Sequence, residues 1–158
     1  MPDAAIQPVV RSVREAVILA GGLGTRLRAA IGDQQKIITK VSGEPFVRLL
    51  LRQLAAAGVQ RVVLAVGYQG EQVRATLGDH GEGMTLHYSQ ESAPAGTGGA
   101  LRLARSLLSE PEVLVLNGDS LVTADLGVFT REAMARQAPL SLLLAKVQNG
   151  ADYGQVQQ

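Results

Sequence analysis

The sequence has 158 residues, of which 46% are hydrophobic and 18% are charged, and its formal net charge is +1. This composition excludes a disordered chain, the near-neutral charge gives no electrostatic reason to expect nucleic acid, and the absence of cysteine excludes disulfides and thiolate metal sites. The apolar runs are too short to span a membrane and the N-terminus holds no apolar signal region, so we expect a cytoplasmic domain without a membrane partner.

The first half of the chain alternates short apolar runs with helical patterns. Residues 16–20 and 62–66 are continuous apolar runs that end at glycine, which is typical of strands buried on both faces. Between them, apolar residues at helical spacing predict a helix over 45–57, with proline at its first position. A short helix over 69–77 follows, and then a more alternating strand over 84–89, nearer the edge of the sheet.

The second half continues the same alternation. An amphipathic stripe predicts a helix over 101–108, and the apolar run 113–116 predicts another buried strand. A helix over 127–137 and a strand over 140–146 come next, and an extended segment begins at 153–157. Strands that alternate with helices indicate βαβ units, so we expect an α/β fold with a mostly parallel sheet.

One domain is predicted for the whole chain, residues 1–158, with an N-terminal extension over 1–14. No linker, repeat or low-complexity tract divides it. Because an extended segment starts just before Gln158 and no closing helix follows, we expect the domain to be incomplete at its C-terminus. An unfinished sheet edge favours pairing between copies of the chain, so a homo-oligomer is also expected.

A glycine-rich segment follows the first predicted strand and has the features of a phosphate-binding loop. It reads Leu19-Ala20-Gly21-Gly22-Leu23-Gly24-Thr25-Arg26-Leu27. The glycines let backbone N–H groups face a phosphate without obstruction by Cβ, while Thr25 adds a hydroxyl and Arg26 a guanidinium fork. A leucine stands where the dinucleotide-binding fingerprint has its third glycine, and the lysine of a P-loop is missing. A tight turn with a solvated arginine is the plainer alternative.

A lysine and an aspartate extend this candidate site. The chain has twelve arginines but only three lysines, and Lys36 and Lys40 lie together after the glycine loop. Asp119 ends the run Asn117-Gly118-Asp119 after the strand at 113–116, and a carboxylate is a hard oxygen ligand that suits Mg²⁺. The plainer alternatives are a surface lysine and an aspartate that caps a turn.

A second cluster of small residues lies between the predicted strand at 84–89 and the helix that follows. It reads Pro94-Ala95-Gly96-Thr97-Gly98-Gly99-Ala100. Small residues permit a flat ligand to approach the backbone, and a helix start supplies free N–H groups. A flexible turn with Thr97 as the N-cap is an equal alternative. Because parallel sheets bind ligands beyond the carboxyl ends of their strands, we expect the three features to form one site.

In order and spacing, these segments resemble the sugar-1-phosphate nucleotidylyltransferases from about Ala16 to Gly154. Within that family the chain looks closest to the D-glycero-α-D-manno-heptose 1-phosphate guanylyltransferase group, through Glu91 and the second glycine cluster among others. The resemblance implies a Rossmann-like, three-layer α/β nucleotidyltransferase fold. It also implies an Mg²⁺-dependent reaction in which a nucleoside triphosphate and a sugar-1-phosphate give an NDP-sugar and pyrophosphate.

Several functions remain open at this point. GTP with a heptose or hexose phosphate is the first expectation, and an enzyme that uses UTP or dTTP is the second. A nucleotide-binding module without full activity is a further alternative. A dinucleotide-dependent oxidoreductase is disfavoured because Leu27 stands where glycine is needed.

The resemblance further implies roles for individual residues. Arg26 and Lys36 would be catalytic: the arginine would hold the phosphates that leave as pyrophosphate, and the lysine would neutralise the reacting phosphates. Asp119 would bind Mg²⁺. The nucleotide would lie against Leu19, Ala20, Gly21, Gly22, Gly24, Thr25, Glu91, Gly96, Thr97, Gly98, Asn117 and Gly118.

The chain departs from the family pattern in two places. The family loop reads Pro-Lys-Pro, whereas this chain has Gln35-Lys36-Ile37, and the loss of two prolines should make the loop less rigid. The second magnesium-binding aspartate of the family, and much of its sugar-binding half, lie beyond the equivalent of Gln158. We therefore expect either a longer parent protein or impaired activity.

Overall fold

The computed structural model describes residues 12–22, 35–67, 69–147 and 156, and it contains a central sheet of five strands in the order β5-β6-β4-β1-β7. The three pairings among its longer strands are parallel, and only the short β5 pairs antiparallel with β6. In chain order the strands of this sheet are β1 (Glu15–Ala20), β4 (Arg61–Val66), β5 (His80–Gly81), β6 (Met84–Gln90) and β7 (Val113–Asn117). The predicted, mostly parallel α/β sheet is confirmed.

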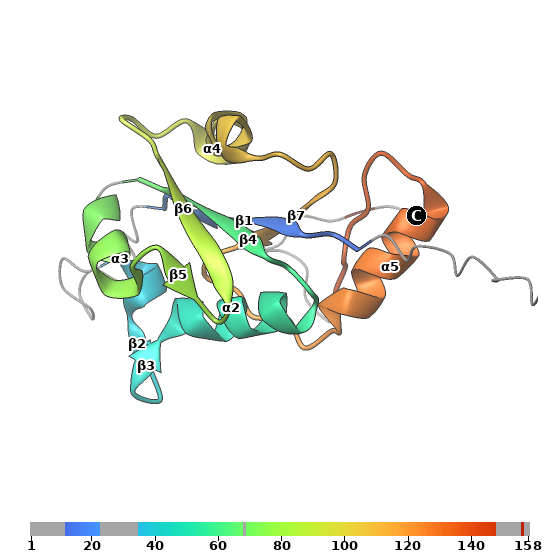
Figure 1. The fold of residues 1–158 in the computed structure, drawn as a ribbon, viewed down its shortest axis with the longest axis horizontal. Coiled ribbons are helices and arrows are strands. Elements are labelled where there is room, and N and C mark those ends of the chain that lie inside the picture. The colour runs from blue at the N-terminus through green and yellow to red at the C-terminus, as the bar shows by residue number, and fades with distance from the viewer. Residues whose placement is uncertain (1–11, 23–34, 68, 148–155, 157–158) are drawn as a thin grey trace, which may run out of the picture.

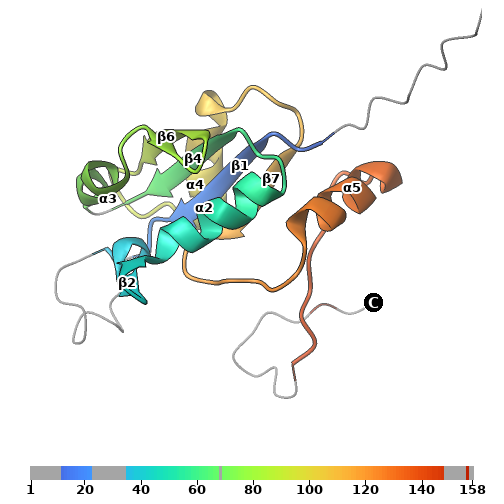
Figure 2. The ribbon, with the colours of Figure 1, turned by 60° about the horizontal axis from the view of Figure 1, so that its bottom comes forward.

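Helices cover both faces of the sheet, which gives the three layers that were expected (Figures 1 and 2). On one face lie α2 (Phe46–Ala56) and α3 (Gly70–Leu77), and on the other lies α4 (Gly96–Ala104). The last helix, α5 (Leu126–Arg136), packs against α2. No helix in the described ranges is long and apolar enough to cross a membrane.

The core is divided by the sheet into two parts. The larger part lies between the sheet and α2, where Ile18, Leu64 and Leu50 are completely buried. The smaller part lies under α4, where Val17 and Val63 pack with small alanines of that helix. Because neighbouring residues of a strand face opposite sides, the continuous apolar runs supply both parts, as the sequence predicted.

Several short elements were not predicted. A 3-10 turn, η1 (Lys36–Ile38), precedes a small hairpin of β2 (Lys40–Val41) and β3 (Glu44–Pro45), and a second 3-10 turn, η2 (Arg105–Leu107), follows α4. The proline expected at the first position of α2 instead stands at its N-cap. The helix predicted over 101–108 begins earlier, at the glycines of the second cluster.

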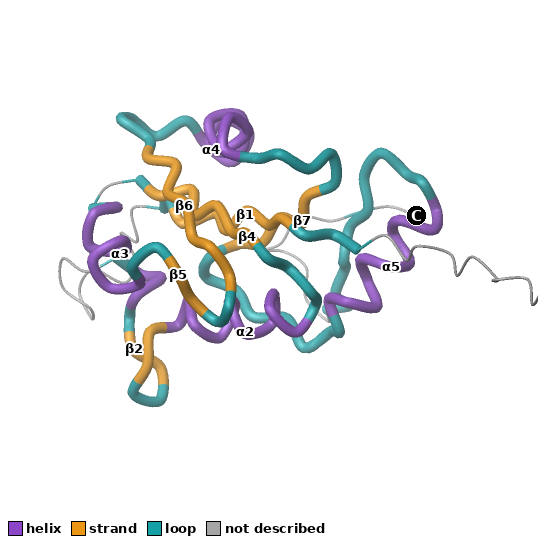
Figure 3. Tube along the Cα trace, viewed as in Figure 1, coloured by secondary structure: helices purple, strands orange, loops and turns teal. Residues whose placement is uncertain are grey.

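The strand predicted over 140–146 is wrong: residues 138–147 form no regular structure (Figure 3). A strand needs a neighbour for its backbone groups, and residues 140–146 pair with no strand in the described part of the chain. Residues 138–143 and β7 instead line a common hollow of about 1080 Å³. Leu140 is 73% exposed, and Val115 on β7 is 43% exposed. The extended segment expected over 153–157 lies outside the described residues except for Val156.

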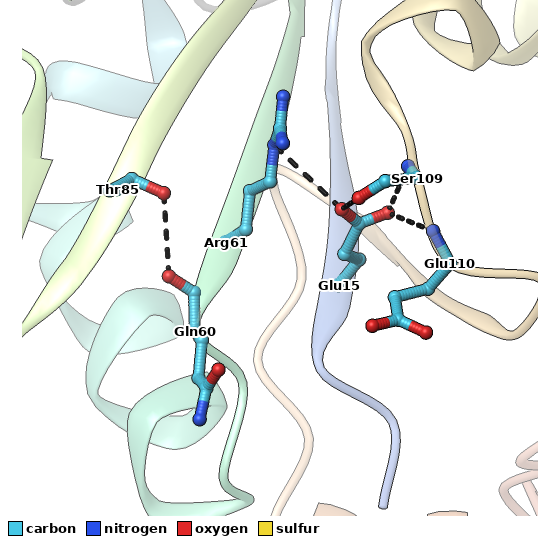
Figure 4. A network of polar contacts seen from close by, with 6 residues as sticks. All are labelled: Glu15, Gln60, Arg61, Thr85, Ser109 and Glu110. Atoms are coloured by element: carbon cyan, nitrogen blue, oxygen red, sulfur yellow. Dashed lines mark hydrogen bonds and ion pairs between the residues drawn. The ribbon is translucent and has the colours of Figure 1, made fainter.

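A buried carboxylate fastens the end of the sheet at which the parallel strands begin (Figure 4). Glu15 accepts hydrogen bonds from the backbone N–H groups of Ser109 (2.8 Å) and Glu110 (3.0 Å) and from the Ser109 hydroxyl (2.5 Å). The Arg61 guanidinium lies 3.8 Å away. Burial raises the pKa of Glu15, but these hydrogen bonds and Arg61 outweigh it, so the pKa is lowered. The charged side chain thus ties the connection before β7 to β1.

Candidate functional site

The carboxyl ends of β1 and β7 meet through a close contact that only glycine permits. The Gly118 N–H donates to the carbonyl oxygen of Leu19 at 2.8 Å. A Cβ on Gly118 would lie 2.7 Å from that oxygen and 2.9 Å from Cδ1 of Ile37. The absence of a side chain therefore lets the chain turn directly out of β7 and places Asp119 at the sheet edge.

The same edge brings a predicted catalytic residue against the predicted metal ligand. The ammonium Nζ of Lys36 lies 2.9 Å from Oδ2 of Asp119, although the two residues are 83 positions apart. Their side chains are 38% and 50% exposed, so the pair is open to solvent on one side. The hydrogen bond from Lys36 is the main reason why the pKa of Asp119 is lowered, against the effect of burial. The aspartate is therefore a carboxylate at neutral pH.

The glycines at the end of β1 face the ends of β4 and β6. A Cβ on Gly67 would lie 2.8 Å from the carbonyl oxygen of Gly21, so the two backbones are in close approach. The Glu91 N–H donates to the carbonyl oxygen of Val66 at 2.9 Å, and its Oε2 lies 3.1 Å from where a Cβ of Gly21 would stand. A Cβ on Gly22 would meet nothing within 4 Å. Backbone groups of this glycine turn are therefore accessible beside one carboxylate.

The second glycine cluster forms the first turn of α4. Its N-cap is Ala95, which offers no side-chain cap, and Gly96 adopts a φ of +70°. Thr97 is exposed within the first turn, so the alternative that made it the N-cap is wrong. Added Cβ atoms on Gly96 and Gly98 would meet nothing within 4 Å. The first turn of α4 therefore has open space beside Gly96 and Gly98, and the first N–H groups of a helix have no partner within the helix itself.

The remaining predicted residues are placed unequally. Gly24, Thr25 and Arg26 lie outside the described residues, so their roles stay predictions. Leu19 and Ala20 are the last residues of β1, and Asn117 is exposed at the end of β7, where it lines the large cavity.

Sequence reasoning missed one residue of the site. The Ser120 hydroxyl donates to Oδ1 of Asp119 at 2.9 Å, whereas Lys36 donates to the other carboxylate oxygen, Oδ2. Ser120 also lines the cavity beside β7. Its position directly after Asp119 was the only signal in the sequence.

The ligands available at this edge suit a cation whose remaining ligands are water and phosphate oxygens. The described part of the chain contains no group of three or more histidine, aspartate or glutamate side chains that could hold a metal. Asp119 supplies hard carboxylate oxygens, and the Lys36 ammonium already occupies one of them as a positive charge. Mg²⁺ is commonly bound by one or two carboxylates with water and phosphate oxygens, and this chemistry fits the residues present.

Comparison with known proteins gives a consistent set of relatives. A family described as nucleotidyl transferase matches residues 15–158. The chain is 34% identical to the D-glycero-alpha-D-manno-heptose 1-phosphate guanylyltransferase of Aneurinibacillus thermoaerophilus, over 90% of this chain and 62% of that protein. It is also 34% identical to the mannose-1-phosphate guanylyltransferase of Mycobacterium tuberculosis, over 89% of this chain and 39% of that protein.

Solved structures give the same picture. Crystal structures of HddC from Yersinia pseudotuberculosis, one of them complexed with GMP-PN, match with a TM-score of 0.69 and 33% identity, covering 77% of this chain and 55% of that one. The chain thus spans less than two thirds of the length of these relatives. The predicted fold and the predicted resemblance are both confirmed.

Proposed function

Because the chain belongs to the nucleotidyl transferase family, we propose that the protein condenses a nucleoside triphosphate, GTP first, with a heptose or hexose 1-phosphate. The products are an NDP-sugar and pyrophosphate, and the ion required is Mg²⁺. The observation that carries the proposal is the 2.9 Å contact between Lys36 and Asp119 beside the glycine turn of β1. The names of the relatives, which are sugar-1-phosphate guanylyltransferases, support the substrate class.

The reaction needs positioning and charge neutralisation more than covalent chemistry. A phosphate oxygen of the sugar-1-phosphate attacks the α-phosphorus in line and forms the new P–O bond. The bond from the α-phosphorus to the bridging α,β-oxygen breaks, and its electron pair leaves with pyrophosphate. A site for this reaction must therefore hold two polyanions against each other.

The residues at the sheet edge are suited to that task. Lys36 would neutralise the reacting phosphates with its ammonium, and Asp119 would hold Mg²⁺, which supplies further positive charge when bound. Backbone N–H groups of Gly21 and Gly22 would face the phosphates. Arg26 would hold the two phosphates that leave, as the family resemblance implies.

Glu91 and the first turn of α4 would form the pocket for the base. The carboxylate of Glu91 lies beside Gly21, and Gly96 and Gly98 in the first turn of α4 leave open space where their side chains would stand. A carboxylate accepts two hydrogen bonds side by side, which matches the adjacent N1–H and N2–H₂ donors of guanine. Uracil and thymine present a single N3–H between two acceptors, so we propose that the site prefers GTP.

Nucleotide choice is testable by thermal stability. A ligand that binds only the folded state raises the melting temperature. With Mg²⁺ present, we expect GTP to give the largest shift among GTP, UTP, dTTP, CTP and ATP, and Glu91→Gln to reduce the GTP shift most. Glu110→Gln, the same change at the other end of the sheet, should leave the ranking unchanged. Equal shifts for all five nucleotides would contradict a base pocket.

Transfer itself is tested in the reverse direction. The protein is incubated with a GDP-sugar, Mg²⁺ and labelled pyrophosphate, and the label is followed into GTP. Appearance of labelled GTP supports the enzyme, and its loss in Asp119→Asn ties the activity to this site. Binding of GTP without any labelled GTP would instead support the nucleotide-binding module.

A further inference from the structure

The two oxygens of the Asp119 carboxylate both accept a hydrogen bond from a neighbouring side chain. Oδ2 accepts from Nζ of Lys36 and Oδ1 accepts from the hydroxyl of Ser120, each at 2.9 Å. An ion that approached this carboxylate would find one oxygen neutralised by an ammonium and the other hydrogen-bonded. A cation that binds this carboxylate must therefore compete with the positive charge of Lys36.

The backbone that carries Lys36 is anchored, whereas its side chain is not. Ile37 and Ile38, which follow it in η1, are 2% and 4% exposed, and Cδ1 of Ile37 packs beside Gly118. The Lys36 side chain is 38% exposed, and its ammonium is carried at the end of a flexible four-carbon stem. Its ammonium can thus leave Asp119 without any rearrangement of the core.

We propose that the Lys36 ammonium is a placeholder for the divalent cation on Asp119, and that it moves to the phosphates when the nucleotide binds. This inference rests on the proposed function, because it assigns the order in which that site fills. A triphosphate offers the ammonium several anionic oxygens in place of one carboxylate. Its arrival frees Asp119, so the metal and the nucleotide bind together.

Two consequences follow from this exchange. Divalent metal binds weakly to the nucleotide-free protein, since it must compete with a charge already in place. The nucleotide strengthens metal binding, and by linkage the metal strengthens nucleotide binding by the same factor. Removal of the ammonium should raise the metal affinity of the nucleotide-free protein and reduce this coupling.

The test measures Mn²⁺ binding by electron paramagnetic resonance of the free ion, without and with GTP. Without nucleotide, we expect Lys36→Met to bind Mn²⁺ about fivefold more tightly than the unmodified protein, the effect of removing one exposed ion pair. Lys40→Met, a matched change of an exposed lysine on β2, should leave the affinity unchanged. The double variant Lys36→Met with Asp119→Asn should lose the gain.

Equal Mn²⁺ affinity in the unmodified protein and Lys36→Met would overturn the inference, as would a gain that survives Asp119→Asn or that Lys40→Met reproduces. Because the decisive reading is made without nucleotide, it is separate from transfer. A gain at Lys36→Met in a protein that forms no GTP from labelled pyrophosphate would support the placeholder role of Lys36 and contradict the proposed enzyme.

Discussion

Two carboxylates at opposite ends of the same sheet are held in opposite ways. Glu15, at the end where the parallel strands begin, is 2% exposed and accepts three hydrogen bonds, two of them from backbone N–H groups. Asp119, just past the end of β7, is half exposed and is held by a lysine and a serine side chain. Both have a lowered pKa.

The difference lies in whether the partners can leave. Two of the donors to Glu15 are backbone N–H groups, which cannot withdraw unless the connection before β7 changes its conformation, so the charge of Glu15 contributes to stability. The ammonium on Asp119 can move into solvent or to another anion at little cost, because an exposed ion pair is worth about 1 kcal/mol or less. A similar direction of pKa shift thus marks a structural clamp at one end and an exchangeable site at the other.

The largest expected effect comes from Asp119→Asn. Loss of one electrostatic group at a reacting phosphate typically costs about 10²–10³-fold in rate, so we expect nucleotidyl transfer to fall by about that factor. The free energy of unfolding should change by less than about 1 kcal/mol, because the side chain is half exposed. Turnover and urea unfolding measure the two quantities. A large loss of stability would show that Asp119 is a second clamp.

Glu15→Gln should have the converse effect. The amide oxygen can replace Oε2 as the acceptor of both backbone N–H groups, but the negative charge is lost and the NH₂ group faces the Ser109 hydroxyl and the Arg61 guanidinium in place of Oε1. Because hydrogen bonds to a charged group are stronger than neutral ones, we expect a cost of about 1–2 kcal/mol. Urea unfolding measures this loss, with Glu110→Gln as a control because only the backbone of that residue enters the network. The affinity of Glu15→Gln for GTP should not change. Altered GTP binding in Glu15→Gln would contradict the separation of the two ends.

The decrease in the free energy of unfolding at acid pH should depend on Glu15 more than on Asp119. A carboxylate whose pKa is lowered by folding contributes stability above its unfolded pKa, about 4.3 for glutamate, and this contribution is lost as the pH falls through the lower folded pKa. We therefore expect Glu15→Gln to flatten the decrease in unfolding free energy below about pH 4.3. Urea titrations between neutral and acid pH measure the slope, and an unchanged slope would contradict the assignment.

The smallest effect compares two neighbouring glycines in α4. Alanine at Gly98 meets open space, so it should stabilise the helix by about 0.5–1 kcal/mol, while its methyl group weakens GTP binding at the proposed pocket. Alanine at Gly99 would place its Cβ 2.4 Å from that of Ala95, so no gain is expected there. Thermal unfolding with and without GTP separates the two changes. Unaltered GTP binding in Gly98→Ala would move the base pocket away from this turn.

Local sequence was enough to determine the longer strands of the central sheet, the positions of the helices and the family. The runs at 16–20, 62–66 and 113–116 are apolar without interruption, and burial on both faces of a parallel sheet is the arrangement that such runs satisfy. Glycine clusters after two of the strands could also be assigned to the ligand-binding edge, because parallel strands end on the same side.

Tertiary structure alone decided which groups meet. The sequence placed Lys36 and Asp119 in one predicted site, but nothing in it shows that the ammonium contacts the carboxylate across 83 positions, or that Glu15 accepts from the connection before β7. The strand predicted over 140–146 failed for the same reason: its apolar residues satisfy the local pattern, but within the described part of the chain they pair with no strand. The spacing of apolar residues indicates which residues of one segment share a buried face. Strand pairing and charge contacts depend on segments that only folding brings together.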